Sequence, residues 1–196
     1  MYICAIEDER MKYDRIDFWD NVYGFNMRAL KEVALTEPAV DVVDSKVCSF
    51  LAETRSRCVA LKCIFLKSVV TNATPILNID LQSCTEKDLS FTSDFRLRAT
   101  RRDNVHAFVA YFECGFTRLP QPLGFSTSPF AKYTHWKQTI FYLKDPIQMD
   151  EGEELTGRII CRPNPHNERD LDITLIINFD GMHSKLIDQS IEYKLR

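Results

Sequence analysis

Glycine is scarce in this sequence, and the glycine-rich motifs with which enzymes hold nucleotides are missing. The 196 residues include only 6 glycines, and no stretch matches GxGxG, GxGxxG or a P-loop. A nucleoside-binding fold of that type needs such a turn, because the backbone must come close to the cofactor. The GxSxG elbow of α/β-hydrolases and the HExxH helix of zinc peptidases are missing as well. The residues by themselves therefore predict no self-sufficient catalytic centre.

Cysteine pairs, an excess of basic residues and long apolar runs are also missing. The 7 cysteines include no CxxC pair, and their odd number and irregular spacing favour free thiols in a reducing compartment. The net charge of -3 argues against a dedicated nucleic-acid binder, which is usually basic. No apolar run reaches the roughly 18 residues that span a bilayer, and the first residues lack the pattern of a signal peptide. We therefore expect a cytoplasmic and nuclear protein without membrane or direct nucleic-acid contacts.

Three cysteines lie near one another in the sequence, at Cys48, Cys58 and Cys63. Zinc sites usually combine closely spaced cysteine pairs with further cysteines or histidines. The C-x9-C-x4-C spacing here has no such pair and no histidine nearby. We therefore expect no metal site.

From residue 76 onward, short apolar stretches alternate with turn residues. A half-buried strand alternates between apolar and polar side chains, and residues 171–179 follow this pattern. Strands at this spacing, without a helical pattern between them, predict an antiparallel β-sandwich or β-barrel. The predicted strands cover residues 2–6, 76–81, 95–99, 106–116, 134–143, 154–162, 171–179 and 185–195, and the predicted turns lie at 120–122, 145–146, 163–165 and 180–181.

Near the N-terminus the sequence shows a helical pattern instead of short strands. Between residues 15 and 35, apolar side chains recur at spacings of three or four, as one face of a helix requires. Gly24 lies in the middle of this stripe, so we expect two short helices instead of one. Pro38 ends the second helix, because the residue before a proline disfavours the helical conformation. The prediction is thus a mainly β fold, a single domain over 1–196, with a helical arm over 13–36.

Several stretches of the sequence carry a family likeness. Residues 124–139, which include GFST and YTHWKQT, resemble the loop of protein arginine methyltransferases that holds a Thr-His-Trp motif. Residues 18–27, FWDNVYGFNM, resemble the dimerisation arm of the same enzymes, and residues 162–172 resemble a late hairpin of their barrel. The likeness covers residues 2–46 and 69–196, and it is to the C-terminal part of the type I enzymes.

The resemblance implies that this chain is the C-terminal barrel of a methyl-transfer enzyme. In that family an N-terminal domain binds S-adenosylmethionine, and two glutamates of the same domain hold the arginine guanidinium that is methylated. Both features lie upstream of Met1 in the family layout, so the resemblance implies a fragment without cofactor-binding residues that is inactive alone. The expected substrates are arginine-containing proteins, such as Gly/Arg-rich proteins and histone tails.

Four neighbouring residues form the candidate substrate site. In the family the histidine that matches His135 pairs with a carboxylate of the N-terminal domain, which implies a supporting catalytic role. The alternative is a histidine at the barrel rim that a backbone carbonyl satisfies. Trp136 is expected to form an apolar wall for the arginine side chain, or else to be a core residue. Tyr133 and Thr134 complete the predicted substrate-binding set.

The predicted arm carries a large apolar load: Phe18, Trp19, Tyr23, Phe25 and Met27. Two short helices cannot bury these side chains against each other, so we expect a partner surface, the alternative being that they pack back onto the barrel. The resemblance implies a ring of two subunits in which each arm docks on the partner's cofactor domain, as a homodimer or as a heterodimer with a full-length methyltransferase. A rival interpretation of the chain is a non-catalytic regulatory subunit that docks on a full-length methyltransferase through this arm.

Residues 47–68 form an atypical insertion. The sequence before them and the sequence after them would join into a continuous family-like segment if they were removed. Two interpretations stay open: a tolerated surface loop, and a retained intron in the gene sequence.

Overall fold

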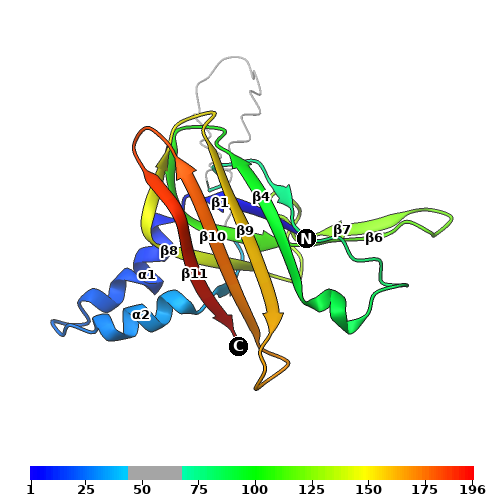
Figure 1. Ribbon diagram of the computed structural model, residues 1–196, viewed down its shortest axis with the longest axis horizontal. Helices are drawn as coiled ribbons and strands as arrows, with labels where there is room; N and C mark the ends of the chain where they lie inside the picture. The colour runs from blue at the N-terminus through cyan, green and yellow to red at the C-terminus, as the bar shows by residue number, and fades with distance from the viewer. Residues whose placement is uncertain (44–67) are drawn as a thin grey trace, which may run out of the picture.

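The computed structural model describes residues 1–43 and 68–196, and its strands form two antiparallel sheets and a separate hairpin (Figure 1). The larger sheet has the strand order β2-β8-β5-β1-β3, the smaller has the order β11-β10-β9-β4, and β6 and β7 form the hairpin. The prediction of a mainly β, antiparallel barrel or sandwich with a helical arm is confirmed. In chain order the elements are β1 (Tyr2–Ile6), α1 (Glu9–Arg15), the short 3-10 helix η1 (Asp17–Asp20), α2 (Arg28–Thr36), β2 (Ala39–Asp41), β3 (Thr74–Pro75), the 3-10 helix η2 (Glu86–Leu89), β4 (Phe91–Arg98), β5 (Asp103–Tyr111), β6 (Glu113–Phe116), β7 (Leu123–Ser126), β8 (Gln138–Met149), β9 (Glu154–Pro163), β10 (Leu171–Asp180) and β11 (Lys185–Leu195).

Two apolar clusters hold the layers together. The first combines side chains of both sheets, among them the fully buried Phe108 and Leu175. The second lies on the other face of the larger sheet and includes Ile16 and Leu35 from the helical segment. Strand β5 is therefore buried on both faces, because Phe108 belongs to the first cluster and Val109 to the second.

Strand β10 follows the alternation predicted for it. Its buried positions are Ile173, Leu175, Ile177 and Phe179, and the positions between them are partly exposed. Next to it in the smaller sheet, the buried Tyr193 of β11 donates a hydrogen bond of 2.9 Å to the carbonyl of Tyr142 in β8. This bond joins the two sheets, because Tyr193 belongs to the first apolar cluster and Tyr142 to the second.

The predicted strand at 76–81 is wrong. Only the two residues of β3 pair with another strand in this region, and the chain then leaves the sheet. Leu81 is 75% exposed, so the apolar stretch that suggested a strand does not bury its side chains as one. The predicted strand 106–116 is also divided, because the chain leaves the larger sheet at Phe112, between β5 and β6.

The predicted turn at residues 145–146 is wrong as well, because both residues lie inside β8. The ladder between β5 and β8 changes register there: Val105 pairs with Ile147, whereas Ala107 pairs with Tyr142. The residues of β8 between these pairs thus form a bulge opposite a single residue of β5. Proline has no N–H for the ladder, and prolines within sheets are confined to edges and bulges. Pro146 therefore lies in the bulge, where no ladder hydrogen bond is required of it, and the strand continues beyond it to Met149.

The helical segment folds back on itself at a tight hairpin, so the predicted break at Gly24 is confirmed. Val22 and Phe25 exchange two backbone hydrogen bonds of 2.9 and 3.0 Å. The φ angles of the two residues between them, Tyr23 and Gly24, are 51° and 93°. Positive φ at both central residues is the geometry of a type I′ turn. The predicted helical pattern started at residue 15, whereas the first α-helix spans Glu9–Arg15, and the part of the pattern before Gly24 forms only the short 3-10 helix η1. The acidic Glu9 suits the first turn of a helix.

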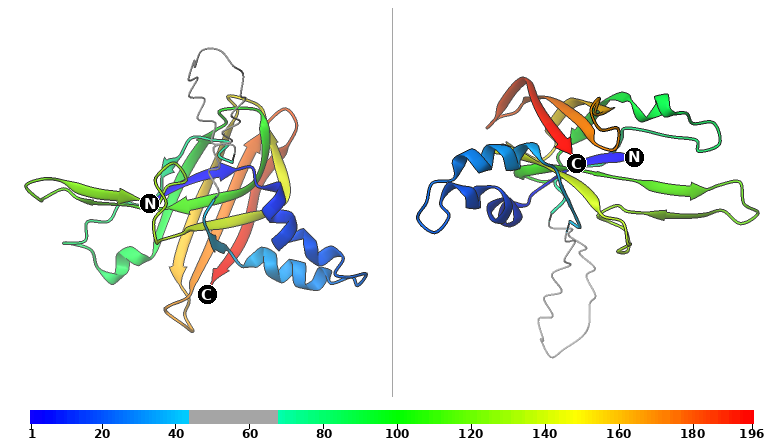
Figure 2. Two further views of the ribbon diagram at one scale, coloured as in Figure 1. Left: turned by 180° about the vertical axis from the view of Figure 1, so that it is seen from behind. Right: turned by 90° about the horizontal axis from the view of Figure 1, so that it is seen from below.

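The helical arm and the β6–β7 hairpin project from opposite sides of the two sheets (Figure 2). Within the part of the chain that the structure describes, no helix is long and apolar enough to cross a membrane, and no three metal-ligating side chains come together. The insertion predicted at 47–68 lies outside the described residues except for Ser68, as do Cys48, Cys58 and Cys63.

Replacing Gly157 of β9 by alanine is expected to lower the free energy of unfolding by about 1 to 2 kcal/mol, because a close contact leaves no room for a methyl group. A Cβ atom there would lie 2.4 Å from Cζ of Phe95 and 2.8 Å from the carbonyl oxygen of Ile176. Gly115→Ala is the matched control, since its Cβ would meet Thr117 at 3.6 Å, an ordinary contact. Urea unfolding of the two variants measures the difference, and equal midpoints would contradict the prediction.

Candidate functional site

A surface hollow with a volume of about 170 Å³ lies between the end of β2 and the segment that leads into β8. Three of the four predicted substrate-site residues, Tyr133, Thr134 and Trp136, contribute to its wall, whereas His135 does not. Its lining residues are Val42, Val43, Thr127, Ser128, Pro129, Ala131, Lys132, Tyr133, Thr134, Trp136 and Gln138. The segment 134–137 was predicted as the start of a strand, but the strand begins only at Gln138. These residues therefore form a loop at the rim of the hollow.

Trp136 is held in this loop by aromatic contacts. Its ring stacks on Phe125 of β7 at a centroid distance of 4.9 Å and an interplanar angle of 12°, and it meets Phe112 edge-on at 6.1 Å. The hydroxyl of Thr134 donates a hydrogen bond of 3.0 Å to the carbonyl of Trp136. Trp136 is nevertheless 53% exposed, so the structure places it at the surface and not in the core.

His135 is exposed between Thr134 and Trp136. Its ring stands edge-on to the indole of Trp136 at 6.5 Å. Among the described residues it makes no hydrogen bond, so the carbonyl partner expected for a rim histidine is not found in that part of the chain. An exposed imidazole at the rim is sterically available to a carboxylate or to a substrate.

Gln138 is a site residue that the sequence analysis did not single out. It is buried, its Oε1 accepts a hydrogen bond of 2.9 Å from the N–H of Val43, and its Nε2 donates one of 2.8 Å to the carbonyl of Thr127. Thr127 in turn exchanges hydrogen bonds of 3.0 and 2.9 Å with the backbone of Phe112. One amide thus fixes three segments of the hollow, and the sequence offers no local signal for partners so distant.

Asp41, at the end of β2, is a second residue that the sequence analysis missed. It pairs with Arg15 at the end of α1, and its Oδ1 lies 3.3 Å from Nζ of Lys137. The N–H of Val42, 2.8 Å from Oδ1, lowers the pKa of Asp41 most; burial opposes this effect, and Lys137 and Arg15 reinforce it. The pKa of Asp41 therefore lies below its usual value, and the carboxylate is charged at neutral pH.

His106, which the sequence placed at the start of a strand, is buried inside β5. Its Nδ1 accepts a hydrogen bond of 3.3 Å from the N–H of Asp8, just before α1, and the hydroxyl of Tyr142 donates one of 2.9 Å to the Asp8 carboxylate. Burial raises the pKa of Asp8 above its usual value. This polar group joins the start of the helical arm to the larger sheet.

The structure exposes most of the apolar side chains predicted on the arm. Tyr23 at the hairpin tip is 92% exposed, and Phe25 and Phe18 are exposed as well, whereas Trp19 and Met27 are half-buried. The rings of Phe18 and Trp19 meet edge-on at 5.7 Å. These side chains form an apolar surface that the described part of the chain leaves largely open.

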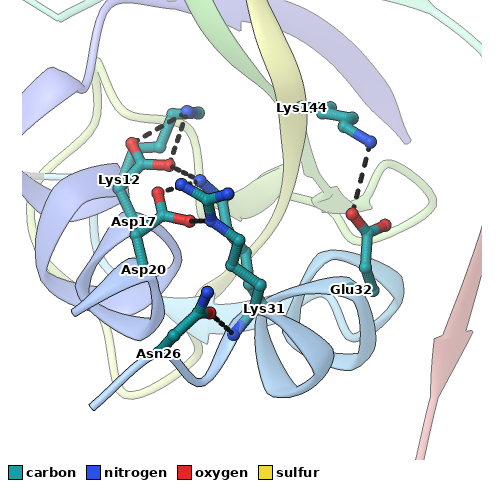
Figure 3. Close-up of polar contacts among 8 residues, drawn as sticks. Lys12, Asp17, Asp20, Asn26, Lys31, Glu32 and Lys144 are labelled. Atoms are coloured by element: carbon teal, nitrogen blue, oxygen red, sulfur yellow. Dashed lines mark hydrogen bonds and ion pairs between the residues drawn. The ribbon is translucent and has the colours of Figure 1, made fainter. Parts of the chain in front are cut away.

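A network of charges joins the two halves of the arm (Figure 3). Asp17 lies 2.9 Å from Nζ of Lys12 and 2.8 Å from Nζ of Lys31, which also reaches Asp20 at 2.6 Å. Burial alone would raise the pKa of Asp17, but the hydrogen bonds from Lys31 and Lys12 outweigh it, so its pKa is lowered. The hydrogen bond from Lys31 also lowers the pKa of Asp20. Figure 3 shows the carboxylates of η1 turned toward lysines of both helices.

The fold and the site define an antiparallel barrel domain with a projecting apolar arm and a hollow that begins where the strand after the arm ends. The chain belongs to the arginine methyltransferase oligomerization subdomain family, which matches residues 1–182. It is 44% identical over 190 residues to protein arginine N-methyltransferase 1 of Caenorhabditis elegans, covering 97% of this chain and 49% of the relative. It is 43% identical over 196 residues to the enzyme of the same name from Dictyostelium discoideum, covering 100% of this chain and 51% of the relative. The chain thus spans about half the length of the curated relatives that it matches.

Solved structures show the same barrel. In the Trypanosoma brucei PRMT1 enzyme–prozyme heterotetrameric complex with AdoHcy, a chain matches with a TM-score of 0.84 and 35% sequence identity, over 100% of this chain and 55% of that one. Protein arginine methyltransferase 10 of Arabidopsis thaliana matches with a TM-score of 0.69 and 14% identity, over 99% of this chain and 58% of that one. The second likeness shows the fold alone.

The residues around the hollow do not fit S-adenosylmethionine. The volume of about 170 Å³ is below the roughly 300 to 1,000 Å³ of typical cofactor sites. Its lining residues include no carboxylate for ribose hydroxyls, and Lys132 is the charged residue among them. A hollow of this volume has room for one end of an extended side chain, but not for a whole nucleoside cofactor.

Proposed function

We propose that this chain forms the barrel half of a protein arginine N-methyltransferase and supplies one wall of the cleft in which an arginine side chain is methylated. The observation that carries the proposal is the hollow, which Tyr133, Thr134 and Trp136 line together in a domain of this family. The partly exposed indole of Trp136 offers an aromatic surface for a guanidinium, which stacks well on such rings. Proposed substrates are arginine residues of Gly/Arg-rich proteins and histone tails, in the cytoplasm and nucleus.

His135 is the proposed supporting residue for catalysis. Its exposed imidazole lies one residue from the indole and can orient a carboxylate contributed by another part of the enzyme, or accept a proton as the guanidinium reacts. The proposed methyl donor is S-adenosylmethionine, bound outside the hollow described above, so the chain is proposed to be inactive by itself.

A chimera tests this proposal. The upstream half of the Caenorhabditis elegans relative is joined to Met1 of this chain, and methyl transfer from labelled S-adenosylmethionine to a Gly/Arg-rich peptide is measured. We expect transfer by the chimera, none by the chain alone, and a loss of about 100-fold in kcat for His135→Ala, the lower end of what a positioned acid–base group contributes.

His166→Ala is the matched control, because His166 is likewise exposed but lies in the turn between β9 and β10. It is expected to leave kcat unchanged. Equal rates for the two histidine variants, in a chimera that binds the methyl donor, would overturn the role of His135. No transfer by a folded, donor-binding chimera would overturn the proposed function.

A second candidate function, a regulatory subunit that docks on a full-length methyltransferase, is supported by one observation. The Trypanosoma brucei relative that matches over the whole of this chain comes from an enzyme–prozyme complex. The test mixes the purified chain with the full-length Caenorhabditis elegans enzyme. Co-elution together with a changed rate of methyl transfer supports this function, and separate elution excludes it for that enzyme.

A further inference from the structure

Two structural features of the site are linked through the larger sheet: the arm, and the loop that carries His135 and Trp136. Strand β2 connects them. It follows the second helix of the arm directly and pairs along the first residues of β8, with Asp41 opposite Gln138 and Val40 opposite Thr139. The loop 133–137 immediately precedes the same residues of β8. A displacement of the arm therefore acts on the strand that borders the loop.

Asp41 adds a direct electrostatic connection to this shared strand. One carboxylate oxygen pairs with the guanidinium of Arg15, at the end of the first arm helix. The other lies 3.3 Å from the ammonium of Lys137, the residue that follows Trp136. The carboxylate stands between two cations, one on the arm and one on the loop, and it is only about one-third exposed. Partial burial keeps such pairs from being fully screened by salt.

The residues just after Asp41 belong to the wall of the hollow. Val42 and Val43 both line it, and the N–H of Val43 is bound by the buried side chain of Gln138. The N–H of Val42 is bound by the Asp41 carboxylate itself at 2.8 Å. Asp41 thus fixes, from one position, the end of the arm helix, the base of the loop and one edge of the hollow.

We propose that Asp41 is a positioning residue that couples the arm to the loop of His135 and Trp136, so that docking of the arm on a partner sets the conformation of the substrate wall. This inference rests on the proposed function for the role of the loop. The physical coupling itself requires neither methyl donor nor substrate. Besides the backbone pairing of β2 with β8, the Asp41 carboxylate gives a second, electrostatic route, and along this route a change in the position of Arg15 reaches Lys137 only while the carboxylate is present.

The two tryptophans of the chain make the test direct, because Trp19 lies on the arm and Trp136 on the loop. Their indole N–H groups give two cross-peaks in a nitrogen–proton correlation spectrum of the complete chain, which the variant Trp19→Phe assigns. We expect Arg15→Gln to shift the cross-peaks of both tryptophans. Asp41→Asn, which keeps an acceptor for the N–H of Val42 and removes the charge, is expected to shift the cross-peak of Trp136.

The decisive comparison is the double variant. Arg15→Gln is expected to cause no further shift of the Trp136 cross-peak when Asp41→Asn is already present. In the presence of Asp41, the conservative variant Arg15→Lys is expected to leave the Trp136 cross-peak near its wild-type position. Asp94→Asn, which removes the exposed ion pair with Arg158 on the smaller sheet, is the control and should leave both indoles unshifted.

Two results would overturn the proposal: a Trp136 cross-peak that ignores Arg15→Gln, or one that shifts equally with and without the Asp41 carboxylate. Because no methyl donor is present, either result leaves the methylation assay of the chimera untouched. Conversely, a chimera without activity overturns the proposed function and not the coupling.

Discussion

Replacing Trp19 by alanine together with Tyr23 by asparagine is expected to weaken association through the arm by about a thousandfold. Removal of an aromatic anchor from the centre of an interface typically costs about 2 kcal/mol or more, and each 1.4 kcal/mol or so is a factor of ten in affinity. Tyr23 stands at the hairpin tip, where it is almost fully exposed, and Trp19 is half-buried behind it. Asparagine is chosen because it tolerates the positive φ of position 23, whereas most other side chains do not.

The measurement is sedimentation velocity of the chimera over a range of concentrations. The parent is expected to sediment as a dimer and the variant as a monomer. Leu81→Ala is the control, since Leu81 is comparably exposed but lies away from the arm. If the arm variant and the parent show the same sedimentation coefficient at every concentration, the apolar surface of the arm is not the interface.

Replacing Asp17 by alanine is expected to lower the free energy of unfolding by about 3 kcal/mol, because it leaves a buried lysine without its counter-charge. The side chain of Lys12 is 7% exposed and that of Lys31 is 18% exposed, and both lysines pair with Asp17. Lys31 keeps Asp20 as a partner after the substitution, whereas Asp17 is the carboxylate that pairs with Lys12 in the described network (Figure 3). Thermal and urea unfolding measure the loss.

Lowering the pH is expected to destabilise the chain as Asp17→Ala does, because protonation removes the same negative charge. The pKa values of Asp17 and Asp20 are lowered in the folded chain. Their contribution to stability is therefore present above the ordinary carboxyl pKa of about 4 and is lost as pH falls through the lowered values. Asp17→Ala should reduce the loss of stability below about pH 4, because the titrating carboxylate is gone. Asp94→Ala removes an exposed ion pair with Arg158 and should lower stability much less. If Asp17→Ala and Asp94→Ala lowered the free energy of unfolding equally, the buried Lys12 would not need its counter-charge, and the prediction would be wrong.

The elements that the sequence predicted well are those whose signals are local. In β10 every second residue is apolar, and the pleat of a strand turns that pattern into one buried face. Gly24 predicted a break because it interrupts the helical stripe, and the structure places it at positive φ in a hairpin tip. Both patterns lie within a few consecutive residues, so they predict local structure without information on residues distant in the sequence.

The features that the sequence did not predict depend on distant partners. Gln138 acts on the hollow through Val43, 95 positions away, and Asp41 acts through Lys137, 96 positions away. The proline of β8 suggested a turn, because nothing in its neighbourhood shows that β5 lies alongside and accommodates a bulge. The family likeness, not periodicity, pointed to the loop of His135 and Trp136, and the structure adds that three of its residues share one hollow.

The hydrogen bond between Gln138 and Val43 also has a consequence for the order in which the chain folds. A contact between residues 95 positions apart forms only after the intervening chain has been brought together, and such contacts are slow to form. The local turns of the arm and the β9–β10–β11 meander need no such search. The hollow is therefore expected to assemble after these local elements, as is the pairing of β1 with β5, which joins residues of similar separation in the sequence. A chain that has folded only its local elements has the turns of the arm but no hollow. During synthesis this interval leaves the aromatic residues of the arm and of the loop accessible to chaperones and to other copies of the chain at the same time.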